Sequence, residues 1–293
     1  MNHPTREGIL YGLGAYVWWG LVPIYFRWLG EISALHILAH RIFWTVIFLA
    51  VIISLSRRWT ETMRCLTTPR LVGPLIASAL LVAGNWLLYI LSVELKVIIQ
   101  ASLGYFILPL VSVVLGMVFF GERLRPLQYL AIAFAFTGVA LLTWEVGTFP
   151  WISLGLAASF SVYGMIRRQV PVDGLIGLTV ETIVLLPIAL GYLAVVYWQR
   201  WEVEDAELLG KLSLSGIVTA IPLLCFGQAA RRLPFSVLGF MQYISPSIQF
   251  LLAVFLIGET VQGGWLNYIL VWTALVIFSL DSYRWFRRRE RVA

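Results

Sequence analysis

The chain has 293 residues, of which 60% are hydrophobic and only 12% charged, with a formal net charge of +6 and a mean hydropathy of +0.87. An ordinary soluble domain carries about 25% charged residues, so a water-soluble fold of this size could not bury so much apolar surface. Lipid is the natural solvent for most of the chain, and the two cysteines, Cys65 and Cys225, indicate neither a disulfide framework nor a metal site.

Ten apolar segments of membrane-spanning length follow one another along the chain. A helix needs about 20 apolar residues to cross the hydrocarbon, whereas a spanning strand would need only about ten in strict alternation, so each segment is predicted to be a helix. The predicted spans are 8–28, 34–55, 70–93, 98–120, 126–144, 149–167, 174–198, 212–230, 235–257 and 264–286. We therefore expect an all-α integral membrane protein with ten transmembrane helices. The first residues, MNHPTREGIL, lead straight into a long apolar segment without a small-residue cleavage site, so no removable signal peptide is expected.

The basic residues divide unequally between the two sides of the membrane when the N-terminus is placed inside. Sixteen lie at inner positions and four at outer positions, and with Arg41 alone inside a span they account for all 21 Lys and Arg. Excess Lys and Arg mark the cytoplasmic side, so both termini are predicted to be cytoplasmic. The positive charge is thus a topology signal, and nucleic acid is not an expected partner.

The second half of the chain repeats a pattern of the first. PLVSVVLGMVFFGE (109–122) matches PSIQFLLAVFLIGE (246–259) with Pro, Gly and Glu all at an offset of 137, and SLGYF resembles VLGFM at an offset of 135. Each copy lies in the fourth span of a five-span half, and an odd number of spans reverses the orientation of the second half. Inverted repeats of this kind are typical of transporters that bind their substrate at the midplane. We expect two inverted five-helix repeats, 1–145 and 146–293, within one transmembrane domain.

Two predicted spans carry ionisable side chains. His40 and Arg41 lie in the second span and form one polar and aromatic patch with Trp44, because residues three and four apart share a helix face. Glu181 lies in the seventh span, which is the second span of its own half. A charge inside a membrane costs at least ~2.5 kcal/mol and usually faces a water-filled cavity.

These ionisable residues are expected to line a central cavity and to handle substrate or ions. Arg41 is a permanent planar donor suited to an anionic group, while His40 and Glu181 could exchange protons during a transport cycle. A purely structural role, in which they hold the two halves together, is the alternative. A direct salt bridge between Arg41 and Glu181 is possible but not implied, because roughly 10 Å along the membrane normal separates them at ~1.5 Å per residue.

Other polar and aromatic residues would suit the lining of such a cavity, where flat and partly apolar solutes could stack on them. They are concentrated in the first, third and fourth spans of a half. The additional candidates are Trp18, Trp19, Asn85, Tyr89, Tyr105, Tyr163, Gln228, Gln242 and Tyr243. For any single Trp or Tyr, helix packing or anchoring at the membrane interface is the simpler explanation.

The repeat also places prolines and glutamates at matching positions of the two halves. Pro109 and Pro246 interrupt the fourth and ninth spans, where a proline frees a backbone carbonyl and allows a kink. They are candidate gating elements, although a static bend explains them equally well. Glu122 and Glu259 are expected to cap or tie the tight turn between the last two helices of each half, which is a structural role.

No catalytic signature accompanies these residues. The chain has no Gly-x-Ser-x-Gly, His-Glu-x-x-His or P-loop sequence, so an enzyme or an ATP-driven pump is not expected and no metal or cofactor is implied. A secondary carrier of a small molecule is the leading hypothesis. An intramembrane enzyme or a membrane-embedded assembly partner is the alternative, and the oligomeric state is left open.

The two five-span halves, each with a Gly-Glu turn after its fourth span, resemble the EamA branch of the drug/metabolite transporter superfamily over essentially the whole chain. The strings AHRIFW, GNWLLY and GFMQYISPSIQFLLAVFLIGE are similar to the RarD group, the chloramphenicol-sensitivity proteins. The resemblance implies a multi-pass carrier of the bacterial inner membrane that exports small amphiphilic metabolites, amino acids or drugs. It implies no particular substrate.

Overall fold

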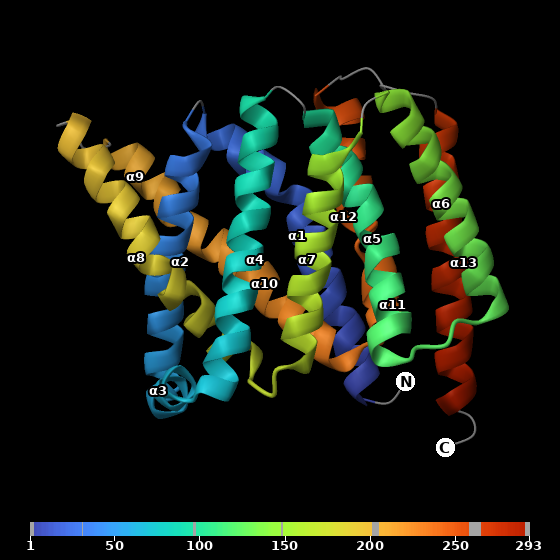
Figure 1. Ribbon diagram of the computed structural model, residues 1–293, viewed down its shortest axis with the longest axis horizontal. Coiled ribbons are helices and arrows are strands. Elements are labelled where there is room, and N and C mark those ends of the chain that lie inside the picture. The colour runs from blue at the N-terminus through green and yellow to red at the C-terminus, as the bar shows by residue number, and fades with distance from the viewer. Residues whose placement is uncertain are drawn as a thin grey trace.

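The computed structural model describes six stretches of the chain, and these stretches form helices and no strand (Figure 1). They are residues 3–30, 32–95, 98–147, 149–200, 205–257 and 265–290. Helices suit a chain in hydrocarbon because each helix satisfies its own backbone N–H and C=O groups. The long helices are α1 (His3–Leu29), α2 (Ala34–Leu55), α4 (Pro69–Glu94), α5 (Ile98–Phe120), α6 (Pro126–Val146), α7 (Trp151–Gln169), α8 (Gly174–Arg200), α10 (Ser215–Arg232) and α13 (Trp265–Glu290). The short ones are α3 (Trp59–Thr67), α9 (Ala206–Ser213), α11 (Phe235–Met241), α12 (Ile244–Leu251) and the π-helix η1 (Leu252–Ile257).

Eight helical segments of the described residues are long and apolar enough to cross a membrane, and they coincide with eight of the predicted spans. The predicted spans 149–167 and 235–257 differ from these eight. α7 occupies the first of them, and its serines and two terminal arginines lower its mean hydropathy. The second is broken into α11, α12 and η1. Because Pro246 has no N–H to donate to the Gln242 carbonyl, the chain starts a new helix with Pro246 in its first turn.

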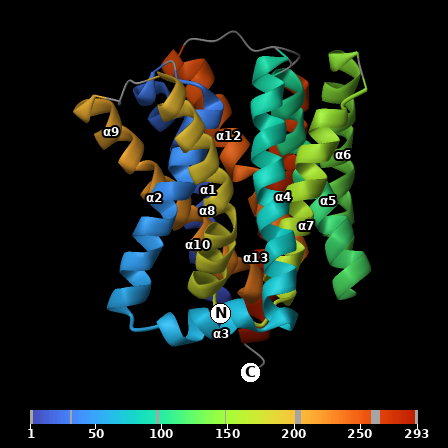
Figure 2. The ribbon, with the colours of Figure 1, turned by 60° about the vertical axis from the view of Figure 1, so that its left-hand side comes forward.

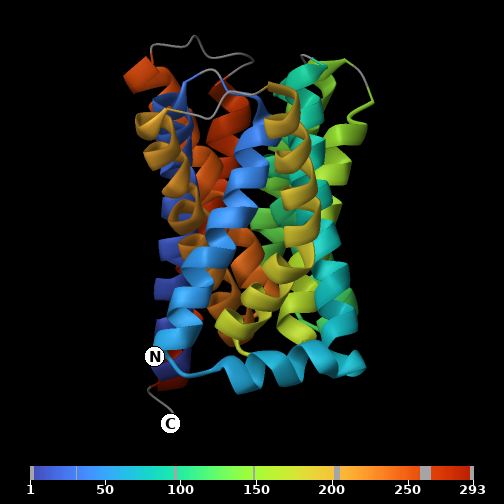
Figure 3. The same ribbon diagram turned by 90° about the vertical axis from the view of Figure 1, so that its left-hand side faces the viewer.

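The ends of α1 and α13 that carry the chain termini lie together at one end of the bundle (Figure 1), which we call the terminal end; the opposite end is the distal end. The amphipathic helix α3 lies across the terminal end (Figures 2 and 3). The sequence did not predict this helix, which is too short and too polar to span. Arg58, directly before α3, pairs with Glu61 at 2.8 Å and with Asp173 at 3.0 Å. These ion pairs tie α3 to the beginning of α8.

Helices of the two sequence halves pack on one another. α1 packs against α10 and α12, while α7 packs against α4 and α5; α2 packs against α8, α6 against α13, and α5 against α11 (Figure 1). Glycines allow the closest crossings. A Cβ on Gly216 would lie 2.5 Å from the backbone of Trp44, and one on Gly138 would lie 2.8 Å from the carbonyl oxygen of Asn267. The apolar cores therefore contain residues of both halves.

Glu122 follows α5 at the terminal end and joins three segments of the chain. One carboxylate oxygen accepts hydrogen bonds from the Phe235 N–H at 2.6 Å and from Arg168 at 2.7 Å, and the other accepts from the Ser236 N–H at 2.8 Å. The prediction that Glu122 ties the turn between α5 and α6 is corrected here. Its carboxylate caps α11, a helix of the other half, where free backbone N–H groups favour negative charge. Glu259, the matching residue of the repeat, lies outside the described residues.

The capping role of Glu122 predicts a pH dependence of stability. Burial alone would raise the pKa of this carboxyl, but the hydrogen bonds from Ser236, Phe235 and Arg168 outweigh burial and lower the pKa. A carboxyl with a lowered pKa stabilises the fold above the ordinary glutamate pKa of about 4.3, and this contribution is lost as the pH falls through the lowered value. We predict that Glu122→Gln lowers the thermal unfolding midpoint at neutral pH, and that its difference from the wild type shrinks at acidic pH.

Scanning fluorimetry of the detergent-purified protein measures this difference across the pH range. Glu207→Gln is the matched control, because the Glu207 side chain is 77% exposed and its pair with Lys211 lies within one helix. A Glu122→Gln midpoint equal to that of the wild type at neutral pH would contradict the capping role.

Candidate functional site

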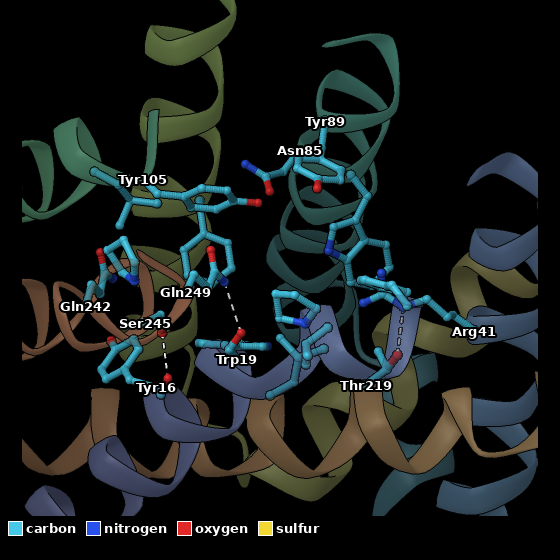
Figure 4. A pocket seen from close by; sticks show the side chains of 18 of the residues that line it. Tyr16, Trp19, Arg41, Asn85, Tyr89, Tyr105, Thr219, Gln242, Ser245 and Gln249 are labelled. Atoms are coloured by element: carbon cyan, nitrogen blue, oxygen red, sulfur yellow. Dashed lines mark hydrogen bonds between the residues drawn. The ribbon is translucent and has the colours of Figure 1, made fainter. Parts of the chain in front are cut away.

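A cavity of about 420 Å³ lies inside the bundle, and Figure 4 shows side chains that line it. Its wall is formed by α1, α2, α4, α5, α7, α10 and the segment from Gln242 into α12, so both sequence halves contribute. α2 lines it with residues near its beginning and α4 with residues near its end, and both of these parts lie toward the distal end. The predicted candidates found in the wall are Trp19, Arg41, Asn85, Tyr89, Tyr105, Gln242 and Pro246.

Arg41 is the single charged side chain in the described wall of the cavity. Its Nε donates to the Thr219 hydroxyl at 2.9 Å. The guanidinium lies over the Trp86 ring at 4.8 Å and the Phe26 ring at 5.7 Å, and aromatic faces stabilise a cation in this position. Among the described residues, no carboxylate lies within the 4.0 Å of a salt bridge from it. Within the described part of the chain, the positive charge of the cavity therefore has no counter-charge.

The α1 wall is held by side chains of the other half. Pro23 cannot donate to the Trp19 carbonyl one turn earlier, and Gln249 Nε2 donates to that carbonyl instead, at 3.1 Å. The Ser245 hydroxyl donates to the Tyr16 carbonyl at 2.7 Å. The Trp19 carbonyl that Pro23 leaves unpaired, and a second bond to the Tyr16 carbonyl, thus fix α1 against α12 (Figure 4).

Trp18 binds a second carbonyl that a proline frees, and it does not line the cavity. Pro222 in α10 cannot donate to the Val218 carbonyl, and the Trp18 indole donates to it at 3.2 Å. We predicted that Trp18 lines the cavity, but its contacts indicate a role in joining helices. Its indole joins α1 to α10.

The cavity wall also offers neutral polar groups and aromatic faces. Asn85 donates through Nδ2 to the Leu156 carbonyl and to the Ser159 hydroxyl, each at 2.9 Å, which fixes its orientation. The Gln242 Oε1 atom is buried and has no hydrogen-bond partner among the described residues. Tyr89 and Tyr105 have ring centroids 6.4 Å apart and face the same space (Figure 4).

His40 and Trp44 lie away from the cavity, although they neighbour Arg41 in the sequence. His40 Nε2 is 3.2 Å from the Tyr197 hydroxyl of α8, and the His40 ring lies 4.7 Å from that of His36. Trp44 has a ring neighbour in Phe43, at 5.3 Å between centroids, and its backbone contacts α10. Successive side chains point about 100° apart on a helix of 3.6 residues per turn. The predicted patch is therefore divided, and of its three members only Arg41 lines the cavity.

Glu181 also lies away from the cavity, toward the terminal end, where it is buried beside Arg167. Arg167 Nε is 3.6 Å from Glu181 Oε1, and the Ser78 hydroxyl donates to the same oxygen. Arg167 Nη2 donates to the Gly174 carbonyl at 3.0 Å. The side chains of Arg167 and Glu181 are only 2% and 1% exposed. The partner of Glu181 is thus Arg167, which the sequence analysis counted among the inner basic residues, and not Arg41.

Three other candidates make contacts outside the cavity wall. Tyr163 stacks on Phe226 with ring centroids 5.9 Å apart. The Tyr243 hydroxyl donates to the Phe106 carbonyl at 3.1 Å. Gln228 accepts a hydrogen bond from Arg232 at the terminal end of α10. These contacts indicate packing and helix-end roles rather than a place in the cavity wall.

The two candidate gating prolines differ in their surroundings. Pro246 lines the cavity at the break between α11 and α12. Pro109 lies inside the continuous helix α5, outside the cavity wall, and its carbonyl would be 3.2 Å from a Cβ on Gly239. The equivalence that the repeat suggests does not extend to their helices: one is broken and the other continuous. Gating remains a prediction for both.

Several wall residues were missed by the sequence analysis, among them Tyr16, Phe26, Thr219, Ser245 and Gln249. One signal was available for two of them. Gln242, Ser245 and Gln249 follow one another at spacings of three and four, which places polar groups on one face of an apolar span.

A helical membrane protein with a ligand-sized cavity between its two halves is the class that fold and site define together. The family model of the EamA-like transporter family matches residues 6–144. An uncharacterized transporter of Vibrio cholerae is 45% identical over 286 residues, covering 96% of this chain and 94% of the relative. Protein RarD of Escherichia coli K12 is 42% identical, covering 98% of each chain. The chain therefore belongs to the EamA-like transporter family, in its RarD group, as the sequence resemblance implied.

A solved crystal structure has the same fold. It superposes with a TM-score of 0.71 at 18% sequence identity, covering 93% of this chain and 97% of the other. The family and the apolar helices together make this chain a multi-span membrane protein and a member of a transporter family.

The buried pair of Arg167 and Glu181 predicts strong coupling between the two residues. Removing one partner leaves an uncompensated buried charge, which typically costs about 3–5 kcal/mol, whereas replacing both with apolar residues of similar volume is often neutral. We predict that Arg167→Met and Glu181→Met each lower the unfolding midpoint strongly, and that the double variant recovers most of the loss. Scanning fluorimetry of the four proteins completes the cycle. Additive losses in the double variant would contradict the pairing.

Proposed function

We propose that the chain is a secondary transporter that exports small amphiphilic metabolites, amino acids or drugs across the bacterial inner membrane by alternating access. The position of the cavity carries this proposal. Both halves of the chain line it, and it extends from the middle of the bundle toward the distal end. With the termini in the cytoplasm, as the distribution of Lys and Arg predicts, the described conformation faces outward.

The contacts between the cavity and the terminal end support an outward-facing state. At the terminal end, Arg167 pairs with Glu181 inside the bundle, Arg168 with Glu122, and Arg58 with Asp173. Ser78 of α4 also donates to Glu181, and Glu122, which follows α5, accepts from the Phe235 N–H of α11. These contacts connect α7 and α8 to α4, α5 and α11. An inward-facing state would have to separate some of them, so we assign them to the closed inner side of the cycle.

The packing pattern supports two inverted repeats and ten spans. In two inverted repeats the counterparts are α1 and α7, α2 and α8, α4 and α10, α5 and the α11–α12 segment, and α6 and α13. The packing of α7 on α4 and α5 then corresponds to that of α1 on α10 and on the α11–α12 segment. The pairs α2 with α8 and α6 with α13 correspond to themselves. In this arrangement α7 and the broken segment 235–257 count as the sixth and ninth spans. Their polar side chains are mostly turned toward other helices, since Ser153, Ser161 and Tyr163 of α7 are buried.

Access from the two sides gives the first test. In a variant without native cysteines (Cys65→Ser and Cys225→Ser), we predict that Val22→Cys in the cavity wall reacts with a membrane-impermeant thiol reagent added outside. Adding Glu181→Gln weakens the inner closure, so the outward-facing population and the labelling rate should fall several-fold. Adding Glu207→Gln, at an exposed carboxylate whose pair with Lys211 lies within one helix, should leave the rate unchanged. Labelling of Val22→Cys from the cytoplasmic side alone would overturn the orientation.

Transport itself gives the second test. Everted membrane vesicles are incubated with labelled amino acids, aromatic acids and amines, and the solute that accumulates is recovered and analysed. A transporter accumulates it chemically unchanged, whereas an intramembrane enzyme, the alternative, alters it. Proton coupling through His40 and Glu181 predicts that His40→Gln and Glu181→Gln remove the pH dependence of accumulation. Parental pH dependence in both variants would make these two residues structural, which is the role that their distance from the cavity wall favours.

A further inference from the structure

We infer that the cavity binds a small organic anion: its carboxylate or similar group on Arg41, its flat apolar body on the aromatic wall, and a hydrogen-bond donor at its far end toward Gln242. This inference rests on the proposed transport function and names the substrate class of that site. Charge, free hydrogen-bonding capacity and shape each contribute to it.

The charge of the cavity is the first observation. Arg41 is the single charged residue of its described wall, and it has no carboxylate partner there. Other arginines that enter the packed bundle do have one: Arg125 pairs with Asp281 at 2.5 Å, Arg168 with Glu122 at 2.7 Å. A cation held away from bulk water without a counter-ion is costly. An anionic ligand would supply that counter-ion, whereas an amine would add a second positive charge.

The hydrogen-bonding capacity of Arg41 is the second observation. Its Nε is occupied by the Thr219 hydroxyl, and neither Nη group has a hydrogen bond to a described residue. The guanidinium faces the cavity (Figure 4), and its central carbon lies over the Trp86 ring at 4.8 Å and the Phe26 ring at 5.7 Å. Two free Nη groups match the two oxygens of a carboxylate, which is the geometry of the strongest charge-assisted hydrogen bonds.

The remaining wall residues favour a ligand with a flat aromatic body. Beyond Trp86 the space is bounded by the rings of Tyr89 and Tyr105, and by Trp19 with Phe160, whose ring centroids are 5.6 Å apart. Aromatic walls bind flat rings through stacking and edge contacts. The volume of about 420 Å³ falls within the range of small-molecule sites. A ligand with one or two fused rings would fill it better than a short aliphatic acid.

Gln242 lies at the end of the cavity opposite Arg41 (Figure 4). The residue is 6% exposed, and its Oε1 has no partner among the described residues. The Oε1 atom is itself buried, so a ligand N–H or O–H would reach it through a rotation of the Gln242 side chain. Because a buried acceptor left unpaired costs stability, that rotation and the new hydrogen bond would be favoured. Figure 4 shows Gln242 and Arg41 on opposite sides of the space, with the aromatic side chains between them. The ligand would therefore carry its anionic group and its donor at opposite ends.

A matched set of probes tests this on the detergent-purified full chain at neutral pH. Indole-3-acetate, indole-3-acetamide and tryptamine share one ring system with an N–H donor and differ in charge. Binding is measured by calorimetry and thermal shift for the wild type, Arg41→Gln and Arg27→Gln. Arg27 is an exposed residue outside the cavity wall, so its variant controls for a general loss of positive charge.

We expect saturable binding of indole-3-acetate to the wild type, with the amide and the amine at least tenfold weaker. Arg41→Gln should weaken the acetate at least tenfold and the amide little, while Arg27→Gln should leave its affinity within twofold. Equal or tighter binding of tryptamine or the amide, absence of saturable acetate binding, or an unchanged affinity of Arg41→Gln would each overturn the inference.

A second variant keeps the inference testable if Arg41→Gln does not fold. Gln242→Met should weaken indole-3-acetate several-fold but leave 1-methylindole-3-acetate, which lacks the N–H donor, unchanged; equal losses for both probes would overturn the assigned far end. Counterflow in proteoliposomes separates this site from the transport function. Arg41-dependent binding without counterflow supports the site and overturns the transport function, whereas counterflow that Arg41→Gln does not alter overturns the site.

Discussion

A polar group inside a bilayer must find its partner within the protein, and most of the organisation of this chain follows from that constraint. The helices satisfy their own backbone groups, but prolines 23 and 222 release carbonyls in the middle of α1 and α10. Gln249 and Trp18 bind these carbonyls from another helix of the opposite half. The prolines thereby specify which helices must touch. The same requirement explains why Glu122 reaches across to the N-terminal end of α11, and why Ser78 and Arg167 surround Glu181.

Arg41 departs from this pattern in a useful way. Its Nε is satisfied by Thr219 and its guanidinium by two aromatic faces, yet its charge is not matched by a described carboxylate. Arg167 is buried nearer the terminal end and lies within ion-pair distance of Glu181. Arg41 is nearer the distal end and has no such partner among the described residues. This difference explains why Arg41 could bind a ligand, whereas Arg167 holds helices together.

Hydropathy was sufficient to predict most of the fold, because crossing a membrane imposes a length and an apolar composition on each span separately. It could not predict the break at Pro246, since a proline inside a span is compatible with a kink, a restart or an undisturbed helix such as the one around Pro109. It also could not tell that Arg167 turns inward while its neighbour Arg168 reaches Glu122, because both lie at a helix end where arginines usually meet water.

In the cavity, Arg41 was predictable as the one basic residue inside a span. Thr219 was not, because small hydroxyl side chains occur throughout membrane helices and only the tertiary fold selects those that face the ligand space.

The hydrogen bonds that hold α1 have a consequence for how the chain divides into moving parts. Tyr16, Trp18 and Trp19 attach α1 to α10, α11 and α12, while α7 packs against α4 and α5. The first helix of each sequence half thus packs into the other half, so the two halves of the sequence are not the two mechanical bodies. A cut between α6 and α7 would produce two fragments, each without the helix that covers its own interior surface. Such fragments should be unable to fold separately and should regain structure only by interlocking with one another, which makes the chain a single intertwined unit.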